Sequence, residues 1–216
     1  MARTVLFDAD GTLFDSEAIR YKALSIAVRE ILNHQFLEWD EYVKRYVNGF
    51  NSLKELLKLD DYTLSKIRSR RAELIKNFVK TDLKFMEGAL ELIRDLYNHG
   101  FRLEIVSSSR KDEIDSYIKA LNISGYFDGM VTLEDVLKVK PDPEPYIKAL
   151  QKFSIKKEES IVIEDTESGL IAAKKAGIRC IIVPNSYTYT SNFKNADLIV
   201  SSLKELNSEK INALFH

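Results

Sequence analysis

The sequence has only one cysteine and no long hydrophobic segment. Cys180 cannot form an internal disulfide, and its place in the apolar run 180–183 predicts a buried structural side chain. No apolar stretch approaches the roughly 20 residues of a membrane-spanning helix. The acidic residues Asp8 and Asp10 interrupt the N-terminal segment before a signal-peptide core can form. We therefore expect a protein of the reducing cytoplasm that does not associate with a membrane.

An excess of charge of one sign is also lacking. The 216 residues include 32 Lys and Arg against 33 Asp and Glu, so no overall positive field favours nucleic acid as a partner. Apolar residues make up 45% of the chain and charged residues 30%, which is the balance of an ordinary globular protein with one large domain or two modest ones. We expect a monomer or a small homo-oligomer that does not bind nucleic acid.

Short apolar or β-branched runs recur along the chain and predict strands. They lie at residues 4–7, 103–106, 129–131, 161–163, 180–183 and 198–200. Helical patterns separate the later runs at the spacing of βα units, at residues 89–98, 112–121, 144–153 and 168–176. Short apolar strands of this kind are typical of a parallel sheet that is buried on both faces. The expected fold class is α/β, with a Rossmann-like parallel sheet and helices on both faces.

The segment between the first strand and the next is different, because it contains no convincing strand. Helical patterns occupy residues 17–32, 41–46 and 64–79. We therefore expect residues 16–83 to form an inserted all-helical cap. The α/β core would then be discontinuous, made of residues 1–15 and 84–216, and joined to the cap by two linkers.

An acidic pair follows the first predicted strand. Asp8 and Asp10 are two residues apart, and side chains at such positions of an extended chain point the same way. The Gly11-Thr12 dipeptide that follows allows the backbone to turn sharply. Two carboxylates that converge at a strand end need a cation, so the pair predicts a metal site.

Polar residues also follow three of the later strands. Ser107 and Ser108 come after strand 103–106, where their hydroxyl and backbone N–H groups could bind a phosphate oxygen or could serve only to cap a helix. Lys140 precedes two prolines that stiffen its loop, so a fixed ammonium that neutralises a phosphate or a carboxylate competes with an ordinary surface lysine. Glu164 and Asp165 form a second acidic pair after strand 161–163.

The order of these four features is more informative than any one of them. Open parallel sheets place their ligands at the carboxyl ends of the strands, so the four features would assemble in one crevice. Carboxylate oxygens suit a hard cation, and Mg²⁺ usually takes one or two carboxylates together with waters and a substrate phosphate. The arrangement predicts a site for phosphoryl transfer.

The four motifs, in this order, resemble those of the haloacid dehalogenase superfamily. Within it the chain is similar to the group with a helical cap of the C1 type, which includes phosphoglycolate phosphatases and β-phosphoglucomutases. The resemblance covers residues 5 to about 177. It implies that Asp8 is the nucleophile and that Asp10 is the general acid and base. It also implies that Ser107, Ser108 and Lys140 hold the phosphoryl group, and that Mg²⁺ binds Asp8, the Asp10 carbonyl and Asp165, with Glu164 as a further ligand or a supporting residue.

The resemblance leaves two activities open within the family. β-Phosphoglucomutases typically have a histidine five residues after the position of Asp15, and an arginine three residues after a cap glycine that Gly49 resembles. This chain has Arg20 and Ser52 at those places. We therefore expect a Mg²⁺-dependent phosphatase that hydrolyses a small phosphorylated metabolite through an aspartyl-phosphate, with a phosphosugar mutase as the alternative.

Other classes of protein fit the sequence less well. An EF-hand loop would need a further acidic residue before Gly11 and a helix in place of the strand, and a dehalogenase of the same superfamily lacks the second aspartate. A receiver domain has no helical insertion after its first strand. A binding or regulatory module without catalysis remains an alternative. Substrate specificity is expected to lie in the cap, where the candidate residues are Arg20, Asn48, Asn51 and Lys54.

Overall fold

The computed structural model describes residues 3–47, 53–189 and 191–215. The chain divides into two compact units. One consists of Met1–Asp15 with Lys84–His216, and the other of Ser16–Leu83. Asn48, Gly49, Asn51 and Ser52, which the sequence singles out in the cap, lie outside the described residues. Within the described ranges, none of the helices combines the length and the apolar character needed to cross a membrane.

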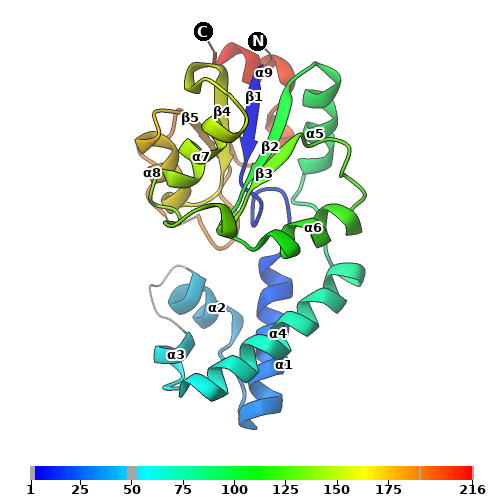
Figure 1. Cartoon of the computed structure of the whole chain (residues 1–216), viewed down its shortest axis with the longest axis vertical. Helices are drawn as coiled ribbons and strands as arrows, with labels where there is room; N and C mark the ends of the chain where they lie inside the picture. The colour runs from blue at the N-terminus through cyan, green and yellow to red at the C-terminus, as the bar shows by residue number, and fades with distance from the viewer. Residues whose placement is uncertain (1–2, 48–52, 190, 216) are drawn as a thin grey trace. The chain divides into compact units, whose positions relative to one another are not determined.

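The larger unit is built on a parallel sheet with the strand order β3-β2-β1-β4-β5-β6 (Figure 1). Its strands are β1 (Thr4–Phe7), β2 (Arg102–Val106), β3 (Gly129–Val131), β4 (Ser160–Glu164), β5 (Arg179–Ile182) and β6 (Leu198–Ile199). Phe7, the last residue of β1, pairs with Ile105 in β2 and with Ile163 in β4. The carboxyl ends of these central strands therefore lie level with one another.

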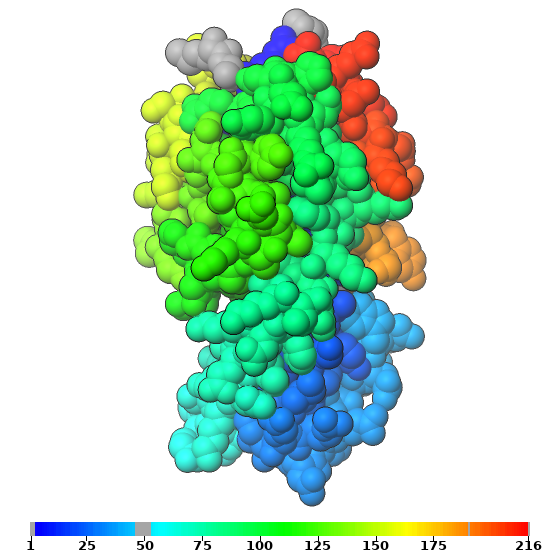
Figure 2. All heavy atoms as spheres, turned by 90° about the vertical axis from the view of Figure 1, so that its right-hand side faces the viewer, coloured from blue at the N-terminus to red at the C-terminus, as the bar shows by residue number. Residues whose placement is uncertain are grey.

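Helices cover both faces of the sheet, because right-handed crossovers that run in opposite directions along a sheet lie on opposite faces. The helices of this unit are α5 (Ala89–Asn98), α6 (Lys111–Ala120), α7 (Glu144–Lys152), α8 (Glu167–Lys175) and α9 (Ser208–Ala213). Short 3-10 turns occupy Leu133–Asp135, Lys157–Glu159 and Leu203–Glu205. Atoms of α5, α6 and the C-terminal segment lie next to one another on the surface of this unit (Figure 2). The expected α/β class with a Rossmann-like sheet is confirmed.

The core beneath α7 and α8 is apolar and tightly enclosed. Leu6 of β1, Val162 of β4 and Cys180 of β5 are fully buried in one cluster with side chains of both helices. Alternation along β1 places Leu6 on this face and Val5 and Phe7 on the other, and all three are buried. A strand buried on both faces reads as a continuous apolar run, which is why the sequence predicts these strands well.

The smaller unit is all-helical within its described residues. It contains α1 (Glu17–Leu32), α2 (Trp39–Tyr42), a π-helical turn (Val43–Val47), α3 (Leu53–Leu56) and α4 (Asp61–Thr81). The helical pattern at residues 41–46 is therefore divided between the end of α2 and the π-helical turn. The long helices α1 and α4 pack against each other, and Asp60 caps α4 by accepting a hydrogen bond from the Thr63 N–H at 2.7 Å.

Candidate active site

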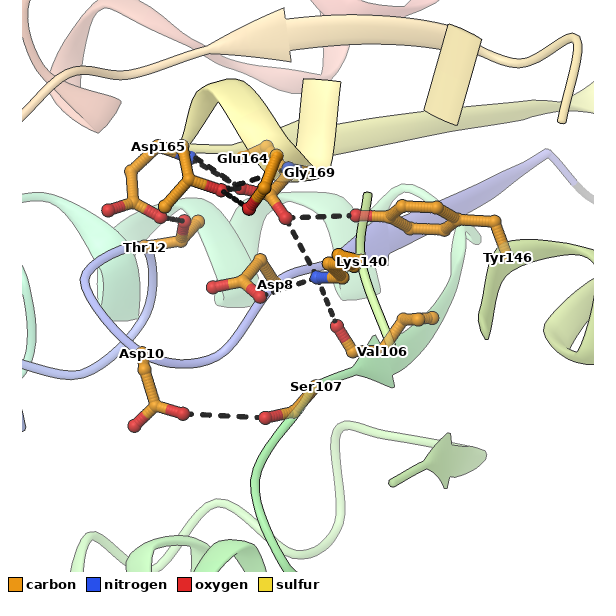
Figure 3. A network of polar contacts seen from close by, with 12 residues as sticks. Asp8, Asp10, Thr12, Val106, Ser107, Lys140, Tyr146, Glu164, Asp165 and Gly169 are labelled. Atoms are coloured by element: carbon orange, nitrogen blue, oxygen red, sulfur yellow. Dashed lines mark hydrogen bonds and ion pairs between the residues drawn. The ribbon is translucent and has the colours of Figure 1, made fainter. Parts of the chain in front are cut away.

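Residues from four separate segments of the larger unit meet at the carboxyl end of the sheet (Figure 3). Asp8 follows β1, and its N–H continues the ladder by donating to the Ile163 carbonyl at 2.9 Å. This pairing places Asp8 beside Glu164, the last residue of β4. Lys140 reaches the same point from the loop before α7. Because parallel strands end at one edge of a sheet, residues far apart in the sequence become neighbours here.

Lys140 is at the centre of the cluster. Its ammonium donates to Asp8 Oδ1 at 2.6 Å, to the Val106 carbonyl at 2.8 Å and to Glu164 Oε1 at 2.7 Å. Only 4% of its side chain is exposed. Burial opposes the charged form, but the carboxylates of Asp8 and Glu164 outweigh burial and hold the pKa of Lys140 above its usual value. The ammonium is thus charged and fixed by three acceptors.

The Asp8 carboxylate lies in a buried and strongly acidic environment. Burial raises its pKa to about 7, the ammonium of Lys140 opposes that rise, and the neighbouring Glu164 and Asp10 add to it. One carboxylate oxygen, Oδ1, accepts from Lys140. Within the described ranges no donor lies in hydrogen-bonding distance of the other oxygen, Oδ2. Asp8 is therefore oriented through Oδ1, and 11% of its side chain is exposed.

Glu164 is saturated with protein donors. Its Oε1 accepts from Lys140 and from the Tyr146 hydroxyl, the latter at 3.2 Å. Its Oε2 accepts from the Asp165 N–H at 3.0 Å and from the N–H and hydroxyl of Thr166 at 3.0 and 2.9 Å. The carboxylate also lies directly over Gly169, where a Cβ atom would come within 1.7 Å of Oε1. The protein itself therefore uses both oxygens, mainly to hold Lys140 and the loop that begins α8.

Asp165 is clamped by two donors that the sequence did not single out. The Thr12 hydroxyl donates to Oδ1 at 3.1 Å, and the Asn185 amide donates to Oδ2 at 2.7 Å. Burial and the charges of Asp8 and Glu164 raise the pKa of Asp165 well above its ordinary value, and the two hydrogen bonds counter that rise.

The acidic residues fit a divalent cation. Asp8, Glu164 and Asp165 each offer a carboxylate oxygen, these atoms lie within 4.8 Å of one another, and all three residues are buried. Three buried carboxylates with one nearby ammonium leave an excess of negative charge that a cation would balance. Oxygen donors are the ligands that Mg²⁺ prefers. Since Glu164 already accepts five hydrogen bonds, Asp8 and Asp165 are the better candidates for direct contact with the metal.

Asp10 lies at the edge of this cluster and faces the hydroxyls that follow β2. Its Oδ2 accepts from Ser109 Oγ at 2.6 Å and from Ser107 Oγ at 3.4 Å. The Ser109 N–H donates to Ser107 Oγ at 2.9 Å, so the two serines and the aspartate form one network. The Ser108 side chain is exposed. Sequence reasoning named Ser107 and Ser108 but missed Ser109, which makes the shorter contact.

The sequence carries different amounts of information about the site residues that it did not single out. Asn185 follows the predicted strand 180–183 as a polar residue at yet another strand end, so the rule that identified Ser107 and Glu164 could have found it. Thr12 lies next to the acidic pair. Tyr146 gave no signal, because an aromatic residue in a helical pattern predicts core packing, and only the position of its hydroxyl reveals the contact with Glu164.

Replacement of Gly169 by alanine should disrupt the cluster. The added Cβ would lie 1.7 Å from Glu164 Oε1 and 1.9 Å from its Cδ, so the carboxylate must move away from Lys140. Alanine favours a helix over glycine by about 1 kcal/mol, but the clash outweighs this gain. We expect Gly169→Ala to lower the free energy of unfolding by about 1–3 kcal/mol. Urea unfolding measures the loss. Gly125→Ala is the control, because nothing lies within 4 Å of its Cβ position, and an equal loss in both variants would contradict the steric account.

Fold and site together define an α/β enzyme whose carboxylates, lysine and hydroxyls meet at the carboxyl end of a parallel sheet. Residues 5–183 match the family model described as haloacid dehalogenase-like hydrolase, so the chain belongs to this family. The predicted superfamily and the prediction of a hydrolase are confirmed.

Its relatives include named phosphatases. A phosphorylated carbohydrates phosphatase of Thermotoga maritima is 30% identical over 183 residues, covering 82% of each chain. The crystal structure of CbbY from Rhodobacter sphaeroides in complex with phosphate matches with a TM-score of 0.83 at 25% identity, covering 95% of this chain and 96% of that one. A mutant of the same CbbY has been solved with xylulose-(1,5)bisphosphate. A β-phosphoglucomutase from Clostridium difficile shares the fold, with a TM-score of 0.79 at 21% identity and coverage of 100% and 97%.

Proposed function

We propose that this protein is a Mg²⁺-dependent phosphatase that hydrolyses a small phosphorylated metabolite through an aspartyl-phosphate on Asp8. The observation that carries the proposal is the contact between Asp8 and Lys140 at 2.6 Å, inside a buried cluster of three carboxylates that fits a divalent cation. A carboxylate nucleophile, a fixed cation and an acidic metal site are the parts that the transfer of an anionic phosphoryl group needs.

Asp8 attacks phosphorus in the first step of this mechanism. A bond forms between a carboxylate oxygen of Asp8 and phosphorus, and the bond between phosphorus and the leaving oxygen breaks. Asp10 gives a proton to that leaving oxygen. In the second step Asp10 takes a proton from a water molecule that attacks phosphorus, the bond to Asp8 breaks, and phosphate is released. Splitting hydrolysis in this way replaces one difficult displacement by two easier ones.

The surrounding residues hold charge and position in both steps. Lys140 offsets the repulsion between the Asp8 carboxylate and an anionic ester, and Ser107 and Ser108 would donate to the phosphoryl oxygens. Asp8, Asp165 and the Asp10 carbonyl would hold Mg²⁺, which supplies further positive charge at the phosphoryl oxygens. Glu164 supports the site by fixing Lys140, with which its Oε1 makes a contact of 2.7 Å.

The names of two relatives support a proposal for the class of substrate. The Thermotoga relative is named for phosphorylated carbohydrates, and the CbbY mutant binds a sugar bisphosphate. We propose a phosphorylated sugar or a short phosphorylated acid as the substrate, and Ser16–Leu83 as the cap domain that sets specificity. Two of the candidate cap residues form ion pairs within this unit. The distance from the Arg20 guanidinium to Glu17 Oε2 is 3.8 Å, and that from Lys54 Nζ to Asp61 Oδ1 is 2.5 Å.

The test is a screen of phosphorylated sugars and short phosphorylated acids for release of inorganic phosphate, with Mg²⁺ or with a chelator. The proposal expects release that requires Mg²⁺. Isomerisation of a phosphosugar without net release of phosphate would instead identify a mutase. Absence of turnover on every phosphorylated compound, including an activated aryl phosphate, would favour a binding module and overturn the proposal.

A further inference from the structure

Asn185 adds a contact between two loops of the site that follow the neighbouring strands β1 and β4. It lies in the loop that follows β5, and its side-chain Nδ2 donates to Asp165 Oδ2 at 2.7 Å and to the Gly11 carbonyl at 3.1 Å. Asp165 follows β4, whereas Gly11 belongs to the turn that carries Asp10. One amide group thus links Asp165 of the second acidic pair to the turn that follows the first acidic pair.

The orientation of this amide is determined by its own loop. The other end of the side chain, Oδ1, accepts from the Tyr187 N–H at 3.0 Å and from the N–H and hydroxyl of Thr188, both at 3.1 Å. A rotation of the amide by half a turn would face Oδ1 toward the Asp165 carboxylate and leave these three donors without their acceptor. The loop therefore presents Nδ2, the donor, toward Asp165.

The space around the contact is closely filled. Gly11 has a φ of +86°, and a Cβ there would lie 2.5 Å from Asp165 Oδ2 and 2.9 Å from Asn185 Nδ2. A side chain at position 11 would therefore separate the amide from the carboxylate. On the other side the Thr12 hydroxyl holds Asp165 Oδ1 at 3.1 Å. Both carboxylate oxygens of Asp165 are bound, and the turn after β1 supplies one of the two donors.

We propose that Asn185 is a positioning residue, which fixes the Asp165 carboxylate and the turn carrying Asp10 in one arrangement before metal and substrate bind. The inference rests on the proposed function, because it assigns Asp165 to the metal. Partners that orient a metal ligand from behind typically change metal affinity by about 10- to 100-fold when they are removed. Asn185 reaches no substrate position in this account, so its effect should fall on metal binding more than on the chemical step.

Asn185→Ser is the informative variant. A serine hydroxyl can still accept from the N–H groups two and three residues ahead, so the loop keeps its turn, but the side chain is too short to reach Asp165. Calorimetric titration of the metal-free protein with Mg²⁺, without substrate, should show binding weakened by about 10- to 100-fold. Assays with an aryl phosphate should show a raised Mg²⁺ requirement, with kcat largely restored at saturating Mg²⁺.

Thr188→Val is the matched control in the same loop. It removes the hydroxyl that donates to Asn185 Oδ1 and accepts from the Asn185 N–H at 3.0 Å, and it keeps the amide whose Nδ2 contacts Asp165. We expect Mg²⁺ binding within about threefold of the unaltered protein, a change far below that of removing a partner of a metal ligand. Equal weakening in Thr188→Val and Asn185→Ser, or unchanged binding in both, would overturn the positioning role while Mg²⁺-dependent turnover still supported the phosphatase. Failure of the unaltered protein to bind Mg²⁺ or to release phosphate would instead overturn the proposed function.

Discussion

Replacing Asp8 by asparagine should lower Mg²⁺-dependent release of phosphate by about four to six orders of magnitude, the range seen when a nucleophile is removed from a working catalytic unit. The amide cannot form an acyl phosphate, while its size and shape keep the surrounding contacts in place. A continuous phosphate assay on the best substrate of the screen measures the loss. Residual activity within a hundredfold of the unaltered enzyme would rule out Asp8 as the nucleophile.

The loss should not come from unfolding. Asp8 is buried beside Glu164 and Asp165, and burial raises its pKa to about 7, so ionised Asp8 is costly in the metal-free protein. The folded pKa lies above the unfolded value of 3.8, so the folded state binds more protons between these values and stability falls as pH rises through that window. Asparagine does not titrate. We therefore expect the difference in thermal midpoint, Asp8→Asn minus the unaltered protein, to increase from pH 4 to pH 8 when metal is chelated.

Replacing Lys140 by methionine should have the largest effect on stability. The ammonium is nearly inaccessible and bonds Asp8 and Glu164 at 2.6 and 2.7 Å, so its removal leaves buried carboxylates without their counter-charge. Removing one partner from a buried pair typically costs about 3–5 kcal/mol. Urea unfolding in the presence of a chelator should show a loss of this size near pH 8, together with loss of phosphatase activity.

Two controls distinguish an electrostatic loss of stability in Lys140→Met from a loss that any lysine replacement would cause. The ammonium of Lys140 lowers the pKa of Asp8, so its removal should raise that pKa above about 7, and the deficit should shrink as pH falls toward 7 and Asp8 takes up a proton. Lys138 lies two residues away, and its side chain is 72% exposed. Lys138→Met should change stability by no more than about 0.5 kcal/mol. A deficit independent of pH, or an equal loss in Lys138→Met, would contradict the electrostatic account.

Much of the sheet could be predicted because its strands are buried on both faces. Burial of this kind leaves short apolar runs, and the polar residue that follows each run then marks the edge where ligands bind. Asp8, Ser107 and Glu164 were identified by this signal, and the structure places them at that edge. Their catalytic roles rest on the resemblance and on the experiments proposed above.

The contacts that shape the site could not be predicted, because they depend on how loops return to the sheet. Ser109 reaches Asp10 only because the chain turns after β2, and Asn185 reaches Asp165 only because its loop folds back across Gly11. The sequence likewise left open whether Glu164 binds metal directly or supports the site. Its five protein donors and its packing over Gly169 favour the supporting role.

In the proposed mechanism the phosphoryl group passes through Asp8, and an Asp10→Asn variant should trap it there. An activated aryl phosphate needs no proton on its leaving group, so phosphorylation should proceed, whereas hydrolysis should stall without the base. Rapid quenching should then show a burst of one phenolate per enzyme and, by peptide mass spectrometry, a phosphoryl group on Asp8. A phosphoryl group on another residue, or release of the phenolate without covalent labelling, would contradict this mechanism.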